Sequence, residues 1–109
     1  MQHIVSLILN GETKSIFEKN IQTCIPKGLF KLEILSTKTL VFHHYKGYSI
    51  CLCNIDDDQK YVMKCLPSNN TLSDAEAMHV IKEFTKVIIS NYNSKYDSSI
   101  YIDISTIEE

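Results

Sequence analysis

Three cysteines and two histidines in the middle of the chain are the residues that could hold a metal ion. Cys51 and Cys53 are two residues apart in an expected strand, so both thiols point to the same face, and Cys65 belongs to the next strand. His43 or His44 could supply a fourth ligand from the preceding strand. Zinc sites more often use cysteines on turns, where the thiolates converge. Because free cysteines are also among the most buried residues, we interpret these thiols as core residues and predict no metal and no cofactor.

The same residues contain a possible nucleophile and base. Cys51 or Cys53 could be activated by His43, as in cysteine-dependent enzymes. The sequence offers no third group to orient the histidine and no glycine turn for an oxyanion hole. His43 and His44 are adjacent in a strand, so they point to opposite faces and cannot act together. We therefore predict no catalytic residue and a protein that is not an enzyme.

Charge argues against two further classes of ligand. Asp56-Asp57-Asp58 is followed by neither the glycine nor the distal glutamate of a calcium-binding loop, so we interpret it as a solvated turn. The 11 basic residues are all lysine, are interspersed with 13 acidic residues and leave a net charge of -2. Binding to nucleic acid or anionic lipid needs a local excess of cations. We therefore expect no nucleic-acid partner.

The length of the chain and its first residues indicate the number of domains and the cellular location. A chain of 109 residues has the size of one domain, so we expect a single globular domain over residues 1–109. Residues 1–9 lack the positive start and the long apolar run of a signal peptide, and no segment approaches the roughly 20 apolar residues of a membrane span. We therefore predict a cytoplasmic protein with reduced thiols and no membrane insertion. Abundant isoleucine, lysine and asparagine are typical of AT-rich coding sequence, as in a low-GC bacterium, a virus or a protist.

The elements that position these residues follow from changes in hydrophobic period. Apolar and polar residues alternate in some segments, as in half-buried strands, and apolar residues recur at helical spacing in two others. We predict strands over residues 3–10, 30–34, 40–45, 48–55, 61–66 and 100–104, helices over 12–25 and 74–92, and a polar loop over 91–99. The order β-α-β-β-β-β-α-β predicts an α+β fold, with a mainly antiparallel sheet of five or six strands and two helices packed on one face.

The helix over 74–92 has the clearest start. Ser73 and Glu76 have the spacing of a capping box, in which each side chain binds the backbone amide of the other residue. The apolar residues that follow are spaced at three or four, which predicts one buried face. They are Ala77, Val80, Ile81, Phe84, Val87, Ile88 and Tyr92.

A hairpin tip carries the residues that we expect to bind another protein. Tyr45 and Tyr48 flank Lys46-Gly47, which we interpret as a two-residue hairpin loop. Exposed tyrosines favour protein contacts because they add area at low entropic cost, so Tyr45, Lys46 and Tyr48 are the predicted partner-binding residues. Pairing of the tyrosines across the strands of the sheet is the alternative.

Two stretches resemble known families. One is similar to the longin, or SNARE-like, domains of vesicle-traffic proteins, and it comprises 21–26, Lys31-Leu32, Val41-Phe42-His43-His44, Cys51-Leu52-Cys53 and Asp56-Asp57-Asp58. That resemblance implies a helix, three antiparallel strands and a second helix, although residues 60–66 form an extra expected strand and no SNARE heptads follow. The other is similar to small prophage and antitoxin-type β-β-β-α domains, and it comprises Tyr45-Lys46-Gly47-Tyr48-Ser49-Ile50 and Ser73-Asp74-Ala75-Glu76-Ala77. Neither resemblance assigns the chain to a family.

These observations favour a non-enzymatic protein-binding module, such as an inhibitor or an immunity or anti-defence factor from a low-GC virus or mobile element. A longin-like trafficking adaptor and a small zinc-binding or cysteine-dependent protein are the alternatives. The apolar strands over 3–9 and 100–104 lie near the termini, and we expect at least one to be a sheet edge. Because an exposed edge pairs readily with another chain, a homodimer through an edge strand is a further expectation.

Overall fold

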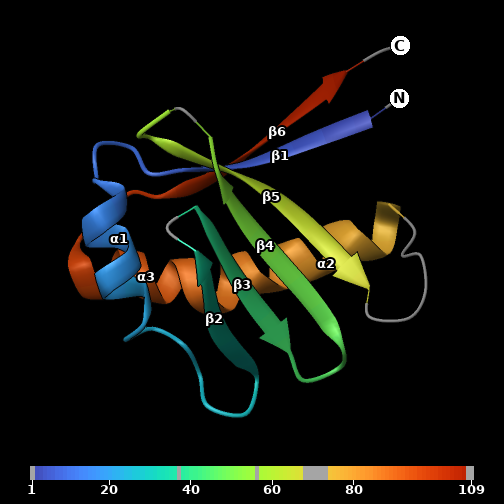
Figure 1. The fold of residues 1–109 in the computed structure, drawn as a ribbon, viewed down its shortest axis with the longest axis horizontal. Helices are drawn as coiled ribbons and strands as arrows, with labels where there is room; N and C mark the ends of the chain where they lie inside the picture. The colour runs from blue at the N-terminus through green and yellow to red at the C-terminus, as the bar shows by residue number, and fades with distance from the viewer. Residues whose placement is uncertain (1, 37, 56, 68–73, 108–109) are drawn as a thin grey trace.

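The computed structural model describes residues 2–36, 38–55, 57–67 and 74–107. Its six strands form one sheet, with the helices beside it (Figure 1). The strands are β1 (Gln2–Ile8), β2 (Phe30–Ser36), β3 (Thr39–His44), β4 (Tyr48–Asn54), β5 (Lys60–Pro67) and β6 (Tyr101–Ile107). The helical segments are α1 (Lys14–Ile21), α2 (Asp74–Phe84), the π-helical η1 (Thr85–Ile89) and α3 (Ser90–Tyr96).

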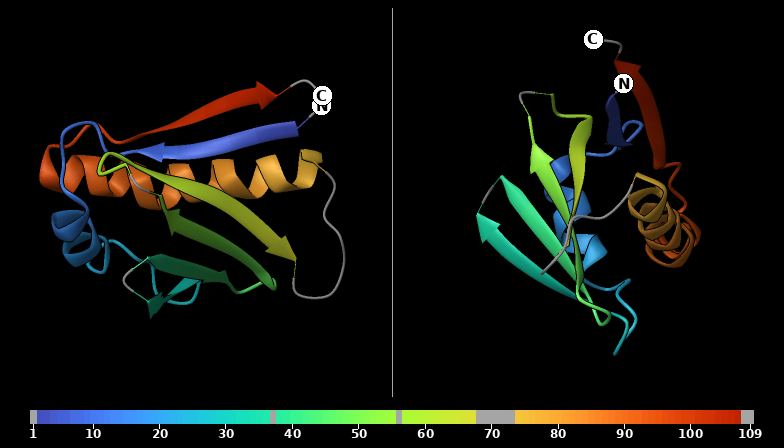
Figure 2. Two further views of the ribbon diagram at one scale, coloured as in Figure 1. Left: turned by 45° about the horizontal axis from the view of Figure 1, so that its top comes forward. Right: turned by 90° about the vertical axis from the view of Figure 1, so that its right-hand side faces the viewer.

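The sheet is antiparallel throughout and has the spatial order β2-β3-β4-β5-β1-β6. Because α2, η1 and α3 are continuous in the chain, the helical layer consists of two units, α1 and α2–η1–α3, which lie on the same side of the sheet (Figure 2). The predicted α+β fold and element order are therefore confirmed. Of the two strands near the termini, β6 is a sheet edge, whereas β1 lies between β5 and β6.

The hydrophobic core lies between the helices and one face of the sheet. The strand register places Leu40, Leu52, Met63 and Val5 in one row across β3, β4, β5 and β1, and all four are buried. Alternate residues on the same strands point to the opposite face, because side chains in a strand alternate. In strands β3 and β4, however, Val41 and Cys51 on the opposite face are buried as well, so burial there is not limited to the covered face.

Aromatic side chains join the helices to the sheet. The Phe17 ring of α1 lies 5.6 Å from the Tyr61 ring of β5 and 5.4 Å from the Tyr92 ring of α3. Phe84 of α2 packs edge-on against Phe42 of β3, with the ring centroids 4.9 Å apart. All five rings are fully buried, and each such burial stabilises the fold by about 1.5–3 kcal/mol relative to an exposed side chain.

The first helix is shorter than the predicted range 12–25. It begins at Lys14, because the Thr13 hydroxyl accepts a hydrogen bond from the Ile16 amide and caps the helix. It ends at Ile21, after which the amides of Thr23 and Cys24 bond to carbonyls three residues back, as in a tightened last turn. Ser73 of the predicted capping box of the second helix lies outside the described residues.

The predicted polar loop over 91–99 is wrong, because the second helix continues to Tyr96 as α3. Tyr92 and Tyr96 are one helical turn apart, and their rings contact each other at 5.0 Å. The Asn93 side chain exchanges two hydrogen bonds with the Ile100 backbone, at 2.9 and 3.0 Å. Side-chain contacts therefore compensate for the low helix propensity of this polar segment, which ends with Asp97 in the left-handed conformation.

The π-helical segment η1 changes which residues of the second helix face the core. A π-turn contains one more residue than an α-turn, so it shifts the face presented by the residues that follow. Ile88 and Ile89 are both buried, whereas the predicted core residue Val87 is partly exposed. The Thr85 hydroxyl donates to the Ile81 carbonyl at 2.8 Å at the start of this segment. None of the helices in the described part of the chain is long and apolar enough to cross a membrane.

Candidate partner-binding surface

The β3–β4 hairpin ends in a three-residue loop rather than the predicted two-residue loop. Strand β3 ends at His44 and β4 begins at Tyr48, so Tyr45 belongs to the loop together with Lys46 and Gly47. The Gly47 amide donates to the His44 carbonyl at 3.0 Å, and Gly47 has φ +94°. A turn followed by a residue in the left-handed region is a common hairpin connection, and glycine adopts that region without strain.

A buried histidine fixes the shape of this loop. The side chain of His44 is 1% exposed, and its ring lies 4.6 Å from the Tyr45 ring and 5.5 Å from the Tyr48 ring. Its Nδ1 accepts a hydrogen bond of 3.1 Å from the Lys46 amide, so in the neutral ring Nε2 carries the proton. This Nε2 lies 3.4 Å from Glu83 Oε1 of α2 and makes no hydrogen bond. His44 therefore links the conformation of the loop to the position of α2.

The structure places the three predicted partner-binding residues differently. Tyr45 is 62% exposed, and the Lys46 ammonium lies 5.7 Å from its ring centroid, within the range of a cation–π contact. Tyr48 is half-buried and packs against the core. Tyr45 and Lys46 thus form the exposed tip of the hairpin, whereas Tyr48 supports it from below.

A basic hollow beside the hairpin contains residues that the sequence analysis missed. It has a volume of about 400 Å³, and we call it the lysine hollow. It is lined by Lys46 of the hairpin, by His79, Lys82 and Glu83 of α2 and by Lys86 of η1. The four helix residues recur at the spacing of one helical face, which is visible in the sequence. The sequence does not indicate that the hairpin tip lies against that face.

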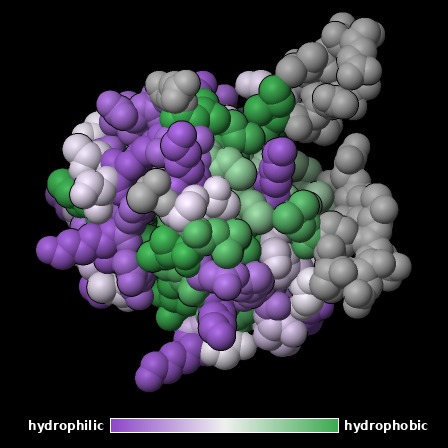
Figure 3. Space-filling view, viewed as in Figure 1, coloured by the Kyte–Doolittle hydropathy of each residue, from purple (hydrophilic) through white to green (hydrophobic). Residues whose placement is uncertain are grey.

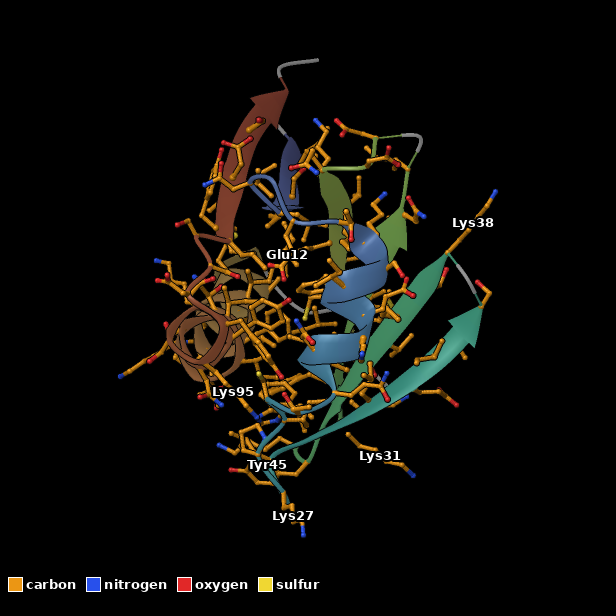
Figure 4. The ribbon with its side chains drawn as sticks, turned by 90° about the vertical axis from the view of Figure 1, so that its left-hand side faces the viewer. Glu12, Lys27, Lys31, Lys38, Tyr45 and Lys95 are labelled. Carbon is orange, nitrogen blue, oxygen red and sulfur yellow. The ribbon has the colours of Figure 1, made fainter. Side chains whose placement is uncertain are left out.

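Several lysines lie toward this end of the molecule although the chain has a net charge of -2. Three lysines and one glutamate line the lysine hollow, and the glutamate faces the buried ring of His44. Lys27 and Lys31 lie toward the same end as Tyr45 (Figure 4). Cations that alternate with acids along the sequence are therefore brought together by the fold. Such a surface attracts a negatively charged ligand.

The cysteines do not converge on one site. Cys51 and Cys53 lie on the open face of β4, whereas Cys65 pairs with Ile50 on the helix-covered side. Burial raises the pKa of the Cys51 thiol, and the neighbouring Cys53 thiol raises that pKa further. Burial likewise raises the pKa of Cys65, which keeps that thiol protonated. Within the described ranges, no group of three or more potential metal ligands comes together.

The histidine of the candidate nucleophile–base pair is occupied by other contacts. His43 Nδ1 lies 3.1 Å from the Ser49 hydroxyl, and His43 Nε2 lies 2.9 Å from Glu33 Oε1. Both ring nitrogens are therefore used, and neither is directed at Cys51 or Cys53. The geometry gives no support to thiol activation by this histidine.

The acidic triplet lies only partly within the described residues. Asp56 lies outside the described residues, and Asp57 and Asp58 are exposed. Asp57 accepts a hydrogen bond of 2.8 Å from the Gln59 amide through its side chain. This is a local turn contact, because the carboxylate bonds to its own backbone two residues on.

No model of a known protein family matches the chain, and neither do curated proteins or solved structures.

Proposed function

We propose that this chain is a non-enzymatic protein-binding module, and that it binds an acidic segment of another protein at the hairpin tip and the lysine hollow. One observation carries the proposal. Lys46 of the hairpin lines the same hollow as Lys82 of α2 and Lys86 of η1, and it follows the exposed Tyr45 in the chain. Carboxylates in the hollow would meet three ammonium groups, and an apolar side chain beside them would pack on the Tyr45 ring.

The chemistry of the surface favours a peptide over a compact ligand. Lysine acts as a flexible point charge and lacks the planar fork with which arginine binds one carboxylate or phosphate in two places. Several spaced carboxylates on one extended segment can each pair with a separate lysine. Tyr45 supplies rigid contact area at low entropic cost, as tyrosines do in protein interfaces. The binding should weaken with added salt, because the charges are exposed.

Selection of peptides from a random display library tests this proposal. The native chain should enrich peptides rich in aspartate and glutamate, and the variant K82E/K86E should lose that preference. Lys95→Glu is the control, because Lys95 does not line the hollow, although its ammonium contacts a tyrosine ring at 5.6 Å much as Lys46 contacts Tyr45 at 5.7 Å. The proposal fails if acidic peptides are not enriched, or if K82E/K86E selects the same peptides as the native chain.

Two cellular roles fit such a module. The first is an inhibitor, or an immunity or anti-defence factor of a virus or mobile element, which blocks a target protein through an acidic segment. The second is a longin-like trafficking adaptor, favoured by the path of the chain from α1 through the three consecutive antiparallel strands β2, β3 and β4. The intervening β5 before α2 departs from that pattern, so we favour the first role.

We also propose a homodimer through a sheet edge. Both edge strands expose large apolar side chains: Ile34 and Leu35 of β2 are 50% and 60% exposed, and Tyr101 and Ile104 of β6 are 50% and 46% exposed. Edge strands of this kind pair readily, because their outer backbone groups are free to bond to another strand. Pairing of one such edge with a second copy would cover the apolar side chains of that edge and leave the lysine hollow free for its partner.

A further inference from the structure

Strand β2 is the better candidate of the two edges for pairing with a second copy. Its central charged residues, Lys31 and Glu33, have opposite signs and flank Leu32. Both are exposed on the face of the sheet that the helices leave open. Figure 3 shows hydrophobic side chains in the middle of that open face, with hydrophilic side chains around them. An added strand would therefore continue a surface that is already partly apolar.

The charges of β2 select one register for antiparallel pairing with itself. A two-fold axis through Leu32 places Lys31 opposite Glu33 of the second copy, and Glu33 opposite Lys31 of the second copy. The same axis places Phe30 opposite Ile34 of the second copy on the helix side. In a continuous sheet, two residues directly opposite each other point to the same face. Every alternative register is therefore centred on another residue of β2. An axis at Lys31 or at Glu33 would place two like charges directly opposite each other, which is destabilising.

A hollow beside β2, lined by three apolar residues and one glutamine, supports the same arrangement. The hollow has a volume of about 380 Å³ and is lined by Gln22, Ile25, Leu32 and Ile34. Leu32 and Ile34 belong to β2, so a two-fold axis at Leu32 brings the hollows of both copies together at the interface. Ile34, which is half exposed, would then be covered by the second copy. The irregularity in the β2–β3 register lies between Ile34 and Ser36, beyond the central residues of the interface.

The other edge lacks this complementarity. Strand β6 carries a single charged residue, Asp103, between Ile102 and Ile104. An axis at Ile104 would place Asp103 opposite Ser105 of the second copy, and an axis at Asp103 would place two carboxylates opposite each other. Neither register pairs opposite charges, so β6 offers no electrostatic reason for self-association.

From this complementarity we infer that two copies of the chain pair through β2 in an antiparallel register centred on Leu32, which extends the sheet across a two-fold axis. This inference rests on the proposed edge-strand homodimer and specifies its edge and register. The resulting interface is isologous, because each copy contributes the same strand and the pairing closes without further copies. The lysine hollow is lined by residues of the hairpin, α2 and η1 and does not include β2.

Charge exchange on β2, followed by light scattering coupled to size-exclusion chromatography, tests the register. In K31E both central charges of the strand become negative, and in E33K both become positive. Each variant alone should dissociate roughly tenfold or more readily than the native dimer, because the opposed charges then repel. An equimolar mixture of K31E and E33K should form a heterodimer, and the double variant K31E/E33K should form a homodimer again. This rescue separates the interface from misfolding, since a misfolded strand would not be restored by a second change.

Ile104→Lys on β6 is the control for the opposite edge, and it should leave the dimer intact. A native chain that stays monomeric at high concentration overturns both this inference and the proposed homodimer. A dimer that persists in K31E and E33K but is lost in Ile104→Lys overturns the β2 register and leaves an edge-strand homodimer in place. A mixture of K31E and E33K that stays monomeric also overturns the register. None of these outcomes bears on peptide binding at the lysine hollow, which has its own test.

Discussion

Tyrosines lie at both ends of the helical layer, but their polar groups are used in different ways. At the end formed by α1 and α3, the Tyr92 hydroxyl donates to Glu12, and the Ser98 hydroxyl donates to the other oxygen of that carboxylate at 2.9 Å. The Tyr96 hydroxyl bonds to the Thr23 hydroxyl. At the hairpin end, Tyr45 is mostly exposed and contacts a buried histidine and an exposed lysine.

Tyr92 and Tyr96 therefore have a structural use, whereas Tyr45 is placed where it could contact a partner. In the α1–α3 region each of these two tyrosine hydroxyls has a partner inside the chain, so both are used within the fold. In the hairpin region the loop is held by His44 from below, while Tyr45 and the lysines face outward. A rigid loop with exposed aromatic and cationic groups loses little conformational freedom when it binds a partner.

The largest expected effect concerns the α1–α3 region. Tyr92→Ala removes a fully buried ring that contacts Phe17 and Tyr96. It should lower the free energy of unfolding by about 3–5 kcal/mol, as truncation of a large aromatic core residue does. Urea denaturation followed by circular dichroism measures this change. A loss below about 1 kcal/mol would contradict the assignment of Tyr92 to the core.

A smaller effect is expected when the ring is kept and the hydroxyl is removed. Tyr92→Phe leaves one oxygen of Glu12 without its donor, so we expect a loss of about 1–2 kcal/mol in a urea titration at neutral pH. The matched change Tyr45→Phe removes a hydroxyl from an exposed ring and should be neutral within about 0.5 kcal/mol. Equal losses in the two variants would abolish the contrast between the two regions.

The buried tyrosines Tyr92 and Tyr61 should also make the stability of the fold depend on alkaline pH. Burial raises the pKa of Tyr92 and of Tyr61 above the usual value of 10, and the nearby carboxylates of Glu12 and Glu18 raise these pKa values further. The folded state therefore keeps both protons while the unfolded chain loses them. This stability is fully present below pH 10 and is lost as pH rises above that value, by up to about 1.4 kcal/mol per pH unit for each group. Urea midpoints measured on both sides of pH 10 should fall on the alkaline side, and less steeply in Tyr92→Phe.

Truncation of the exposed hairpin tyrosine should have the smallest effect on stability and should still weaken peptide binding. Tyr45→Ala truncates an exposed ring and should change the free energy of unfolding by less than about 0.5 kcal/mol. The same variant should enrich acidic display peptides less than the native chain does. Tyr48→Ala is not an equivalent test, because Tyr48 is half-buried against the core. A Tyr45→Ala variant that is destabilised by several kcal/mol would make this ring structural.

Local patterns in the sequence predict most of the fold and only part of the binding surface. Alternation of apolar residues identifies the strands, and the capping residues and apolar spacing identify the helix that contains Phe84. The extension of that helix to Tyr96 depends on contacts of Asn93 and Tyr96 with residues elsewhere in the chain, which local propensity does not encode. Lys46 is visible as an exposed hairpin residue, but its proximity to Lys82 requires the packing of the hairpin on α2.

The central claim is that acidic protein segments bind at the hairpin tip and the lysine hollow. Two-dimensional NMR of the isotope-labelled chain, titrated with a short polyglutamate peptide, tests it most directly. We predict that the shifted amides lie within residues 45–48 and 79–86, that added salt reverses the shifts and that a polylysine peptide causes none. The absence of shifts with polyglutamate, or shifts confined to the α1–α3 region, would contradict the claim.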